Sequence, residues 1–85
     1  MKQEASFFDG QEPELVYIAK RLRDALEIEG LFDAAGLDYG VEADTYTGGI
    51  VFRSERVGAF FYVMPDLAET ARNVLKMHGF KPSVQ

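Results

Sequence analysis

The side chains best suited to bind a ligand lie around a glycine pair in the middle of the chain. Glycines let a ligand approach the backbone closely, and arginines with nearby hydroxyl groups hold phosphates or carboxylates. The Gly-Lys-Ser/Thr ending of a P-loop is absent. Ordinary hairpin chemistry explains the same pattern, so a ligand or partner contact here is one of two interpretations. Its residues are Tyr46, Thr47, Gly48, Gly49, Arg53 and Arg56.

The remaining reactive side chains do not favour catalysis. The chain has no cysteine and one histidine, His78, which excludes thiolate zinc sites and disfavours other transition-metal sites. Glu29 and Asp33 stand one helical turn apart and could chelate a cation weakly, although a solvated acidic face is the favoured interpretation. We therefore expect no enzyme activity, no catalytic residue, no metal and no cofactor.

Composition and charge limit the classes of partner. The 85 residues carry a net charge of −5, and residues 1–49 hold four basic and eleven acidic side chains. An acidic chain is poorly suited to bind nucleic-acid backbones, which need clustered Lys and Arg. No stretch reaches the roughly 20 apolar residues of a membrane span, and the first residues lack the apolar run of a signal peptide. We expect a cytoplasmic protein.

The first half of the chain predicts a strand followed by a helix. Leu15–Ala19 is a short apolar run, typical of a buried strand. Apolar residues then recur at spacings of three and four, from a D-x-x-E capping box at Asp24 and Glu27 to a helix-ending glycine at Gly36. Gly30 inside this helix marks either close helix–sheet packing or a tolerated defect.

The second half predicts two more strands and a helix. Leu37–Ala43 alternates between apolar and polar residues, as a strand with one wet face does. We expect a turn at Thr47–Gly49, a short strand at Ile50–Phe52 and a polar connector at Arg53–Arg56. Ala59–Met64 is the most apolar stretch and predicts a central strand.

The last helix has clear predicted ends. A second D-x-x-E box at Asp66 and Glu69 begins it, and Gly79 followed by Phe80 is typical of a Schellman end. We place His78 on its apolar face.

The order β-α-β-β-α predicts an α+β fold, a ferredoxin-like half-sandwich with two helices on one face of an antiparallel sheet. Residues 1–13 form a leader, mobile or docked through Phe7 and Phe8, and residues 14–85 form the domain. The fourth strand of that fold is missing or reduced to Lys81–Gln85. The exposed edge of the first strand then needs a cover: the leader, the C-terminal tail or a second copy of the chain.

Aromatic residues predict an interaction surface on the uncovered sheet face. Tyr17, Phe60 and Tyr62 are its expected members. Such a face stacks bases in RNA-binding folds, but the charge is unfavourable here and the RNA-recognition motif is absent. A protein interface, with the chain as a homodimer, is the favoured interpretation.

The chain resembles a family of short bacterial proteins of unknown function that are described as signal-transducing. The matching features are the helix end at Ala35–Leu37, the strand end at Val63–Asp66 and the Ala-x-x-x-Leu step at Ala71–Leu75. The resemblance implies a β-α-β-β-α fold related in shape to nitrogen-regulatory and amino-acid-sensing modules, and it implies no catalytic residues. The leader and an extended connector at Asp44–Gly58 depart from the family pattern.

These features together predict a non-enzymatic regulatory module of bacterial type that binds a small anionic ligand or a protein partner. The alternative is a small anion- or nucleotide-binding enzyme that uses the Tyr46–Arg56 loop.

Overall fold

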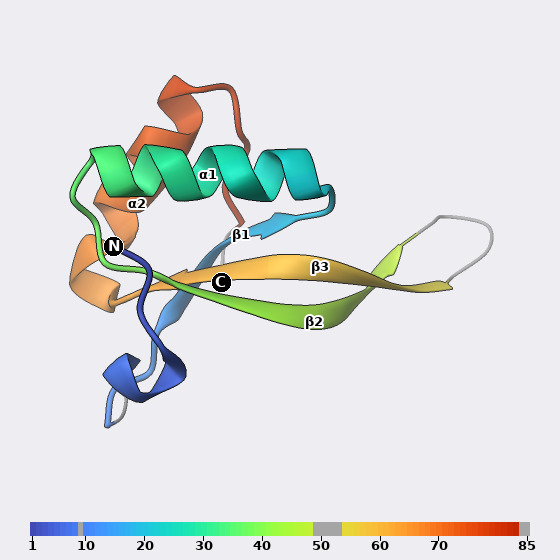
Figure 1. Cartoon of the computed structure of the whole chain (residues 1–85), viewed down its shortest axis with the longest axis horizontal. Coiled ribbons are helices and arrows are strands. Elements are labelled where there is room, and N and C mark those ends of the chain that lie inside the picture. The colour runs from blue at the N-terminus through green and yellow to red at the C-terminus, as the bar shows by residue number, and fades with distance from the viewer. Residues whose placement is uncertain (9, 49–53, 84–85) are drawn as a thin grey trace.

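Two helices cover one face of a three-stranded antiparallel sheet (Figure 1). The computed structural model describes residues 1–8, 10–48 and 54–83. The elements are the 3-10 helix η1 (Ala5–Phe8), β1 (Glu14–Ala19), α1 (Leu22–Ala34), β2 (Gly40–Gly48), β3 (Ser54–Val63), the 3-10 helix η2 (Pro65–Leu67) and α2 (Ala68–Met77). The predicted α+β class and the β-α-β-β-α half-sandwich are confirmed.

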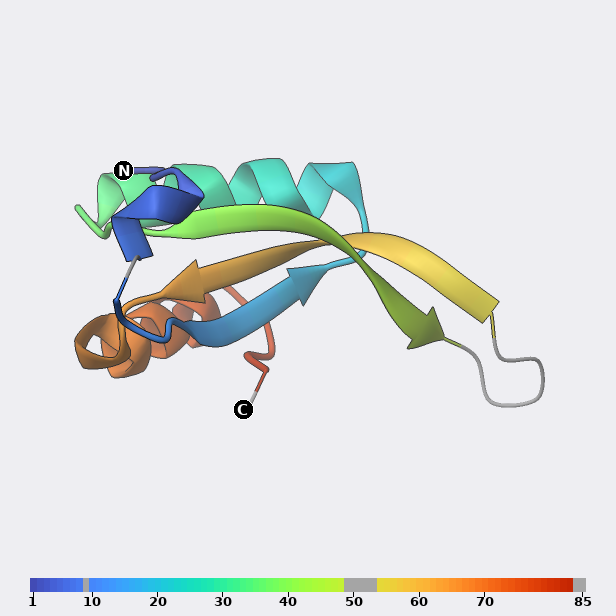
Figure 2. The same ribbon diagram turned by 90° about the horizontal axis from the view of Figure 1, so that it is seen from below.

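The strand order is β1-β3-β2, and β3 runs antiparallel to both neighbours. β1 and β2 are therefore parallel to each other with β3 between them, and α1 forms the crossover. Seen from the uncovered side, the sheet lies in front of the helices, and the leader crosses the start of β2 (Figure 2). No helix in the described ranges is long and apolar enough to cross a bilayer.

The core lies between the helices and the sheet, and aromatic rings fill its centre. Phe32 of α1 meets Tyr39 and Phe61, with ring centroids 5.4 and 6.0 Å away and edge-on geometry. Such edge-to-face pairs add to the free energy gained by burying the rings. The largest fully buried side chains are Tyr39, Phe32, Phe61, Ile28, Leu75, Val16 and Val63.

Both helices end as predicted. Gly36 and Gly79 have positive φ angles of 71° and 84°. In each motif the N–H of the next residue donates to a carbonyl five residues back, from Leu37 to Phe32 at 3.0 Å and from Phe80 to Leu75 at 2.9 Å. These are Schellman motifs, which satisfy carbonyls that the helix itself leaves open.

The predicted capping boxes are wrong. α1 begins at Leu22, two residues before Asp24, so the Asp24 carboxylate lies within the first turn and pairs with Arg21 Nε at 3.3 Å. α2 begins at Ala68, after the turn that Pro65 starts, and Asp66 lies before its N-cap. Neither helix has a side-chain cap hydrogen bond. His78 is exposed at the C-cap of α2 and not on its buried face.

The hairpin is longer than predicted. β2 and β3 pair residue for residue from Gly40–Tyr62 to Gly48–Ser54. The sequence predicted a turn at Thr47–Gly49 and a connector at Asp44–Gly58, but the described residues of both belong to the two strands. The β-branched residues there suit an extended backbone. The predicted strand at Ile50–Phe52 lies outside the described residues.

The C-terminal tail covers the outer edge of β1. Ser83 N–H donates to Val16 O at 2.8 Å, and the Arg72 guanidinium lies 3.2 Å from the Glu14 carboxylate. Phe80 packs edge-on against Tyr17. Among the three covers expected for this edge, the tail is the one that the structure shows, and it takes the place of a reduced fourth strand.

Candidate interaction site

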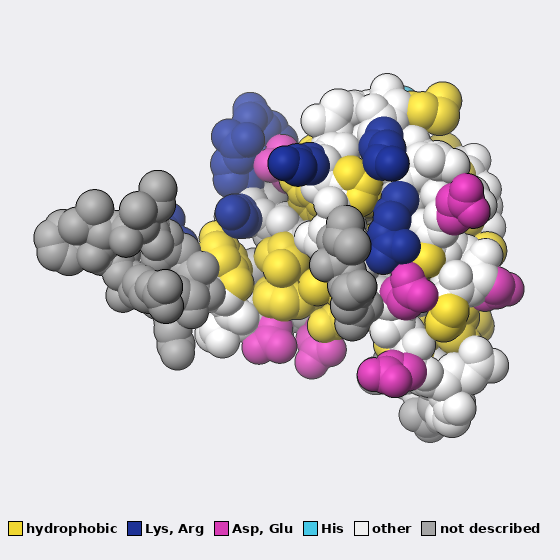
Figure 3. Space-filling view, turned by 180° about the vertical axis from the view of Figure 1, so that it is seen from behind, with side chains coloured by type: hydrophobic (Ala, Val, Ile, Leu, Met, Phe, Trp, Pro, Cys, Tyr) yellow, Lys and Arg dark blue, Asp and Glu magenta, His cyan; other side chains and the backbone are white. Residues whose placement is uncertain are grey.

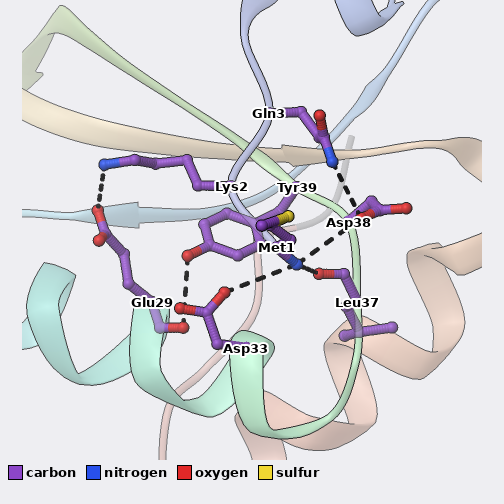
Figure 4. Close-up of polar contacts among 8 residues, drawn as sticks. All are labelled: Met1, Lys2, Gln3, Glu29, Asp33, Leu37, Asp38 and Tyr39. Atoms are coloured by element: carbon purple, nitrogen blue, oxygen red, sulfur yellow. Dashed lines mark hydrogen bonds and ion pairs between the residues drawn. The ribbon is translucent and has the colours of Figure 1, made fainter.

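The leader lies along the outer edge of β2 (Figure 4). Tyr39 N–H donates to Met1 O at 3.2 Å, and Gln3 N–H donates to Tyr39 O at 2.7 Å, so Lys2 and Tyr39 form a parallel bridge. The leader thus covers one end of the β2 edge and not the β1 edge.

Helix α1 supplies the second wall of this contact. Leu22, Leu26, Glu29 and Asp33 follow one another at spacings of three and four and therefore form one stripe along the helix. The Glu29 carboxylate lies 3.4 Å from Lys2 Nζ, and the Asp33 carboxylate lies 3.6 Å from the amino group of Met1.

The leader therefore fills the acidic half of a groove between α1 and the edge of β2. Glu29 and Asp33 contact the leader, which is the role that the structure gives these carboxylates. The described part of the chain holds no group of three or more potential metal ligands.

The Tyr39 hydroxyl lies under the same wall, where it donates to Glu29 O at 3.4 Å. Burial raises the pKa of Tyr39 well above its usual range, and the charges of Asp33 and Glu29 raise it further. Tyr39 is therefore protonated at neutral pH and serves as a core residue rather than as an acid or base.

The other half of the groove is open and mostly apolar, with two basic residues, Lys20 and Arg21, in its lining. It contains a pocket of about 270 Å³ between the start of α1 and the helix side of the sheet. Leu22 and Val57 in its lining are 75% and 69% exposed, and Leu26, on the next turn of the stripe, is 59% exposed. The lining consists of Ala19, Lys20, Arg21, Leu22, Ala25, Val41, Ala43, Val57, Gly58 and Ala59.

The backbone of β2 is unpaired beside this pocket. Both polar backbone groups of Tyr39 point outward to the leader, and backbone direction repeats every second residue along a strand. Val41, Ala43 and Thr45 therefore direct their N–H and C=O groups to the same edge. In the described ranges, none of these groups has a backbone partner there, although the Thr45 N–H donates to its neighbour's carboxylate, Asp44 Oδ1, at 2.8 Å.

Two of the three aromatic residues predicted to form an interface lie on the open sheet face. Phe60 and Tyr62 lie on this face, because Phe61 and Val63, which alternate with them along β3, point into the core. Phe60 is nevertheless buried, and Tyr62 is half-buried. Tyr17 does not lie on the open face, so its predicted placement there is wrong. A bulge between Leu15 and Tyr17 shifts the register, so Tyr17 pairs with Phe61 on the helix side.

Acidic side chains border the open face along β2. Glu42 and Asp44 are exposed there. The pKa of Tyr62 is raised, first by burial and then by the charges of Glu42 and Asp44. Seen from behind, hydrophobic side chains form a band next to the hairpin, with basic side chains on one border and acidic ones on the other (Figure 3).

The predicted ligand loop is divided by the structure. Tyr46 and Arg56 are paired across the hairpin, and Thr47 and Gly48 belong to β2. Lys20 Nζ lies 5.4 Å from the centre of the Tyr46 ring, a cation–π contact that occupies this ring within the chain.

Gly49 and Arg53, the other two members, lie outside the described residues. The part of the loop whose backbone is described consists of regular strand pairs.

The sequence did not reveal the groove itself. Its only signal is that Leu22 and Leu26 stand beside, and not on, the apolar stripe of α1 that faces the core. Comparisons with protein-family models, curated proteins and solved structures find no match to this chain.

Proposed function

We propose that this chain is a non-enzymatic binding module that takes up a segment of another protein in the groove between α1 and the outer edge of β2. The observation that carries the proposal is the exposure of Leu22 and Val57, 75% and 69%, on either side of a pocket beside an unpaired strand edge. Exposed apolar side chains gathered around a pocket mark interaction sites. The regulatory role predicted from the sequence would act through this contact.

A second copy of the chain is the competing occupant, since the sequence predicts a homodimer. Symmetric antiparallel pairing of two β2 edges about Ala43 would place Glu42 of one copy opposite Asp44 of the other. Like charges directly opposite each other destabilise a strand pair. A protein segment of different charge therefore suits this edge better than a copy of β2.

The test is a selection of peptides from a random displayed library on the immobilised protein. We expect selected peptides to lose at least about tenfold in affinity for the variant Leu22→Ser, because burying a leucine contributes about 1.5–3 kcal/mol. Met77→Ser is the matched control, since Met77 is 80% exposed on α2 and lies outside the groove. Equal binding to both variants would contradict the proposal.

The same material tests the homodimer. Sedimentation equilibrium over a range of concentrations measures the mass in solution, and a dimer that Leu22→Ser dissociates would make a second copy the occupant of the groove.

A further inference from the structure

We propose that the segment bound in the groove is an extended strand, added to the edge of β2, in which apolar and basic residues alternate. This inference rests on the proposed function and specifies the chemistry of the partner. It follows from the backbone of β2, from the two kinds of side chain on either side of its edge, and from the way in which the leader binds.

The backbone of β2 is prepared for an added strand. Val41 and Ala43 direct their N–H and C=O groups outward without a partner on another strand in the described part of the chain, whereas the next outward N–H, that of Thr45, donates to the Asp44 carboxylate at 2.8 Å. Strand addition to such an edge gives affinity through main-chain hydrogen bonds. The leader already binds in this way two residues before Val41, where the backbone groups of Met1 and Gln3 form hydrogen bonds with those of Tyr39.

The side chains on the two sides of the edge select the sequence of the added strand. On the helix side, Val41 and Ala43 line the apolar pocket together with Leu22. On the open side, Glu42 and Asp44 are exposed and acidic. Successive side chains of a strand point to opposite faces, so the partner places apolar residues in the pocket and basic residues beside the two carboxylates.

The acidic pair also explains why the edge remains available. Charged residues on an edge strand prevent pairing between copies of the same protein. They do not prevent pairing with a strand of opposite charge, and opposite charges across two strands contribute about 0.2–1 kcal/mol for each pair.

The test uses two synthetic peptides of identical composition, one with alternating valine and lysine and one with the same residues in two blocks. We expect saturable binding of the alternating peptide in a fluorescence anisotropy titration, weaker at high salt. Hydrogen exchange at the amides of Val41 and Ala43 should slow on binding. The block peptide should bind at least about tenfold more weakly, since it cannot satisfy both faces.

Two variants test separately the main-chain hydrogen bonds and the charge complementarity of the added strand. Ala43→Pro removes an outward N–H without breaking a bond to β3, and proline is tolerated at such edge positions; Ala43→Thr keeps the N–H and is its control. The double variant Glu42→Lys, Asp44→Lys reverses the charge and should weaken binding about tenfold. Because both side chains are exposed, this variant tests the proposal even if Ala43→Pro does not fold.

The outcomes separate this inference from the proposed function. Equal binding of the two peptides, or equal binding to Ala43→Pro and Ala43→Thr, overturns the added strand. If library peptides still require Leu22 in that case, the binding module stands and only the strand chemistry is wrong. If no peptide depends on Leu22, both proposals fail.

Discussion

Phe8 lies across Gly40 so closely that a Cβ atom on residue 40 would come within 2.7 Å of the Phe8 ring. Phe8 is 8% exposed, although it belongs to a short leader. Glycine at the start of β2 therefore makes room for the leader on the open face, while Met1–Gln3 occupies the edge of the same strand. The two contacts together hold the leader at one end of the groove.

The first prediction concerns this contact. Gly40→Ala should lower the free energy of unfolding by about 1–3 kcal/mol, because the added methyl group displaces the Phe8 ring. In a Phe8→Ala background the same change should cost much less, since the obstructing ring is gone. Urea denaturation of the four proteins of this double-mutant cycle gives the coupling energy. Additive costs would show that the leader does not depend on Gly40.

The second prediction contrasts two glycines of the α1 region. Gly36 has a φ angle of 71°, which side chains with a Cβ adopt at a cost, so Gly36→Ala should destabilise the protein by about 1–2 kcal/mol. Gly30 lies inside the helix with no atom within 4 Å of its Cβ position. Gly30→Ala should stabilise the protein by about 0.5–1 kcal/mol.

Thermal and urea unfolding of both variants measure these changes. The opposite signs are the essential result, because the two substitutions are chemically identical. A loss of stability in Gly30→Ala would mean that close packing, and not tolerance of a defect, selects this glycine.

The helix ends and the strand order were predictable because both depend on local or topological rules. Gly36 and Gly79 stand where the apolar period stops, and only glycine adopts the required backbone at low cost. The order β1-β3-β2 follows from the split β-α-β pattern of the predicted ferredoxin-like fold, in which the central strand lies between the two parallel ones. These rules need no knowledge of distant contacts.

The errors have a common physical origin, since each depends on a contact that sequence spacing does not encode. The bulge at Val16 reverses the face of Tyr17, and the pattern of the strand alone contains no sign of it. The far end of the hairpin extends beyond the helices, so its residues lack the alternation that burial imposes. The leader binds an edge more than thirty residues away in sequence, and that placement decides which half of the groove stays open.

The third prediction concerns alkaline pH. Burial raises the pKa of Tyr39 in the folded state, and it raises the pKa values of Tyr17 and Tyr62 as well. Unfolded tyrosines lose their proton near pH 10, while the folded ones keep it. The folded state then binds more protons, so the contribution of these tyrosines to the free energy of unfolding is constant below about pH 10 and falls as pH rises above it.

Tyr39→Phe tests this assignment. The variant keeps the ring in the core and removes the ionisable group, so its stability should decline less steeply above pH 10, by up to about 1.4 kcal/mol for each pH unit. At neutral pH it should lose only about 1 kcal/mol, the value of one hydrogen bond. Urea denaturation between pH 8 and pH 11 makes the comparison. Parallel curves for the two proteins would assign the alkaline transition to other groups.

The fourth prediction concerns the tail that covers the edge of β1. Ser83 N–H donates to Val16 O at 2.8 Å, and Ser83→Pro removes that donor. The free energy of unfolding should fall by about 1 kcal/mol, whereas Ser83→Ala, which keeps the N–H, should leave it nearly unchanged. An uncovered β1 edge is also a template for pairing with another chain, so the proline variant should show a larger mass in solution at high concentration. Stability and mass equal to those of the alanine variant would mean that the edge is protected by other contacts, of which the pairing of Arg72 with Glu14 is the nearest.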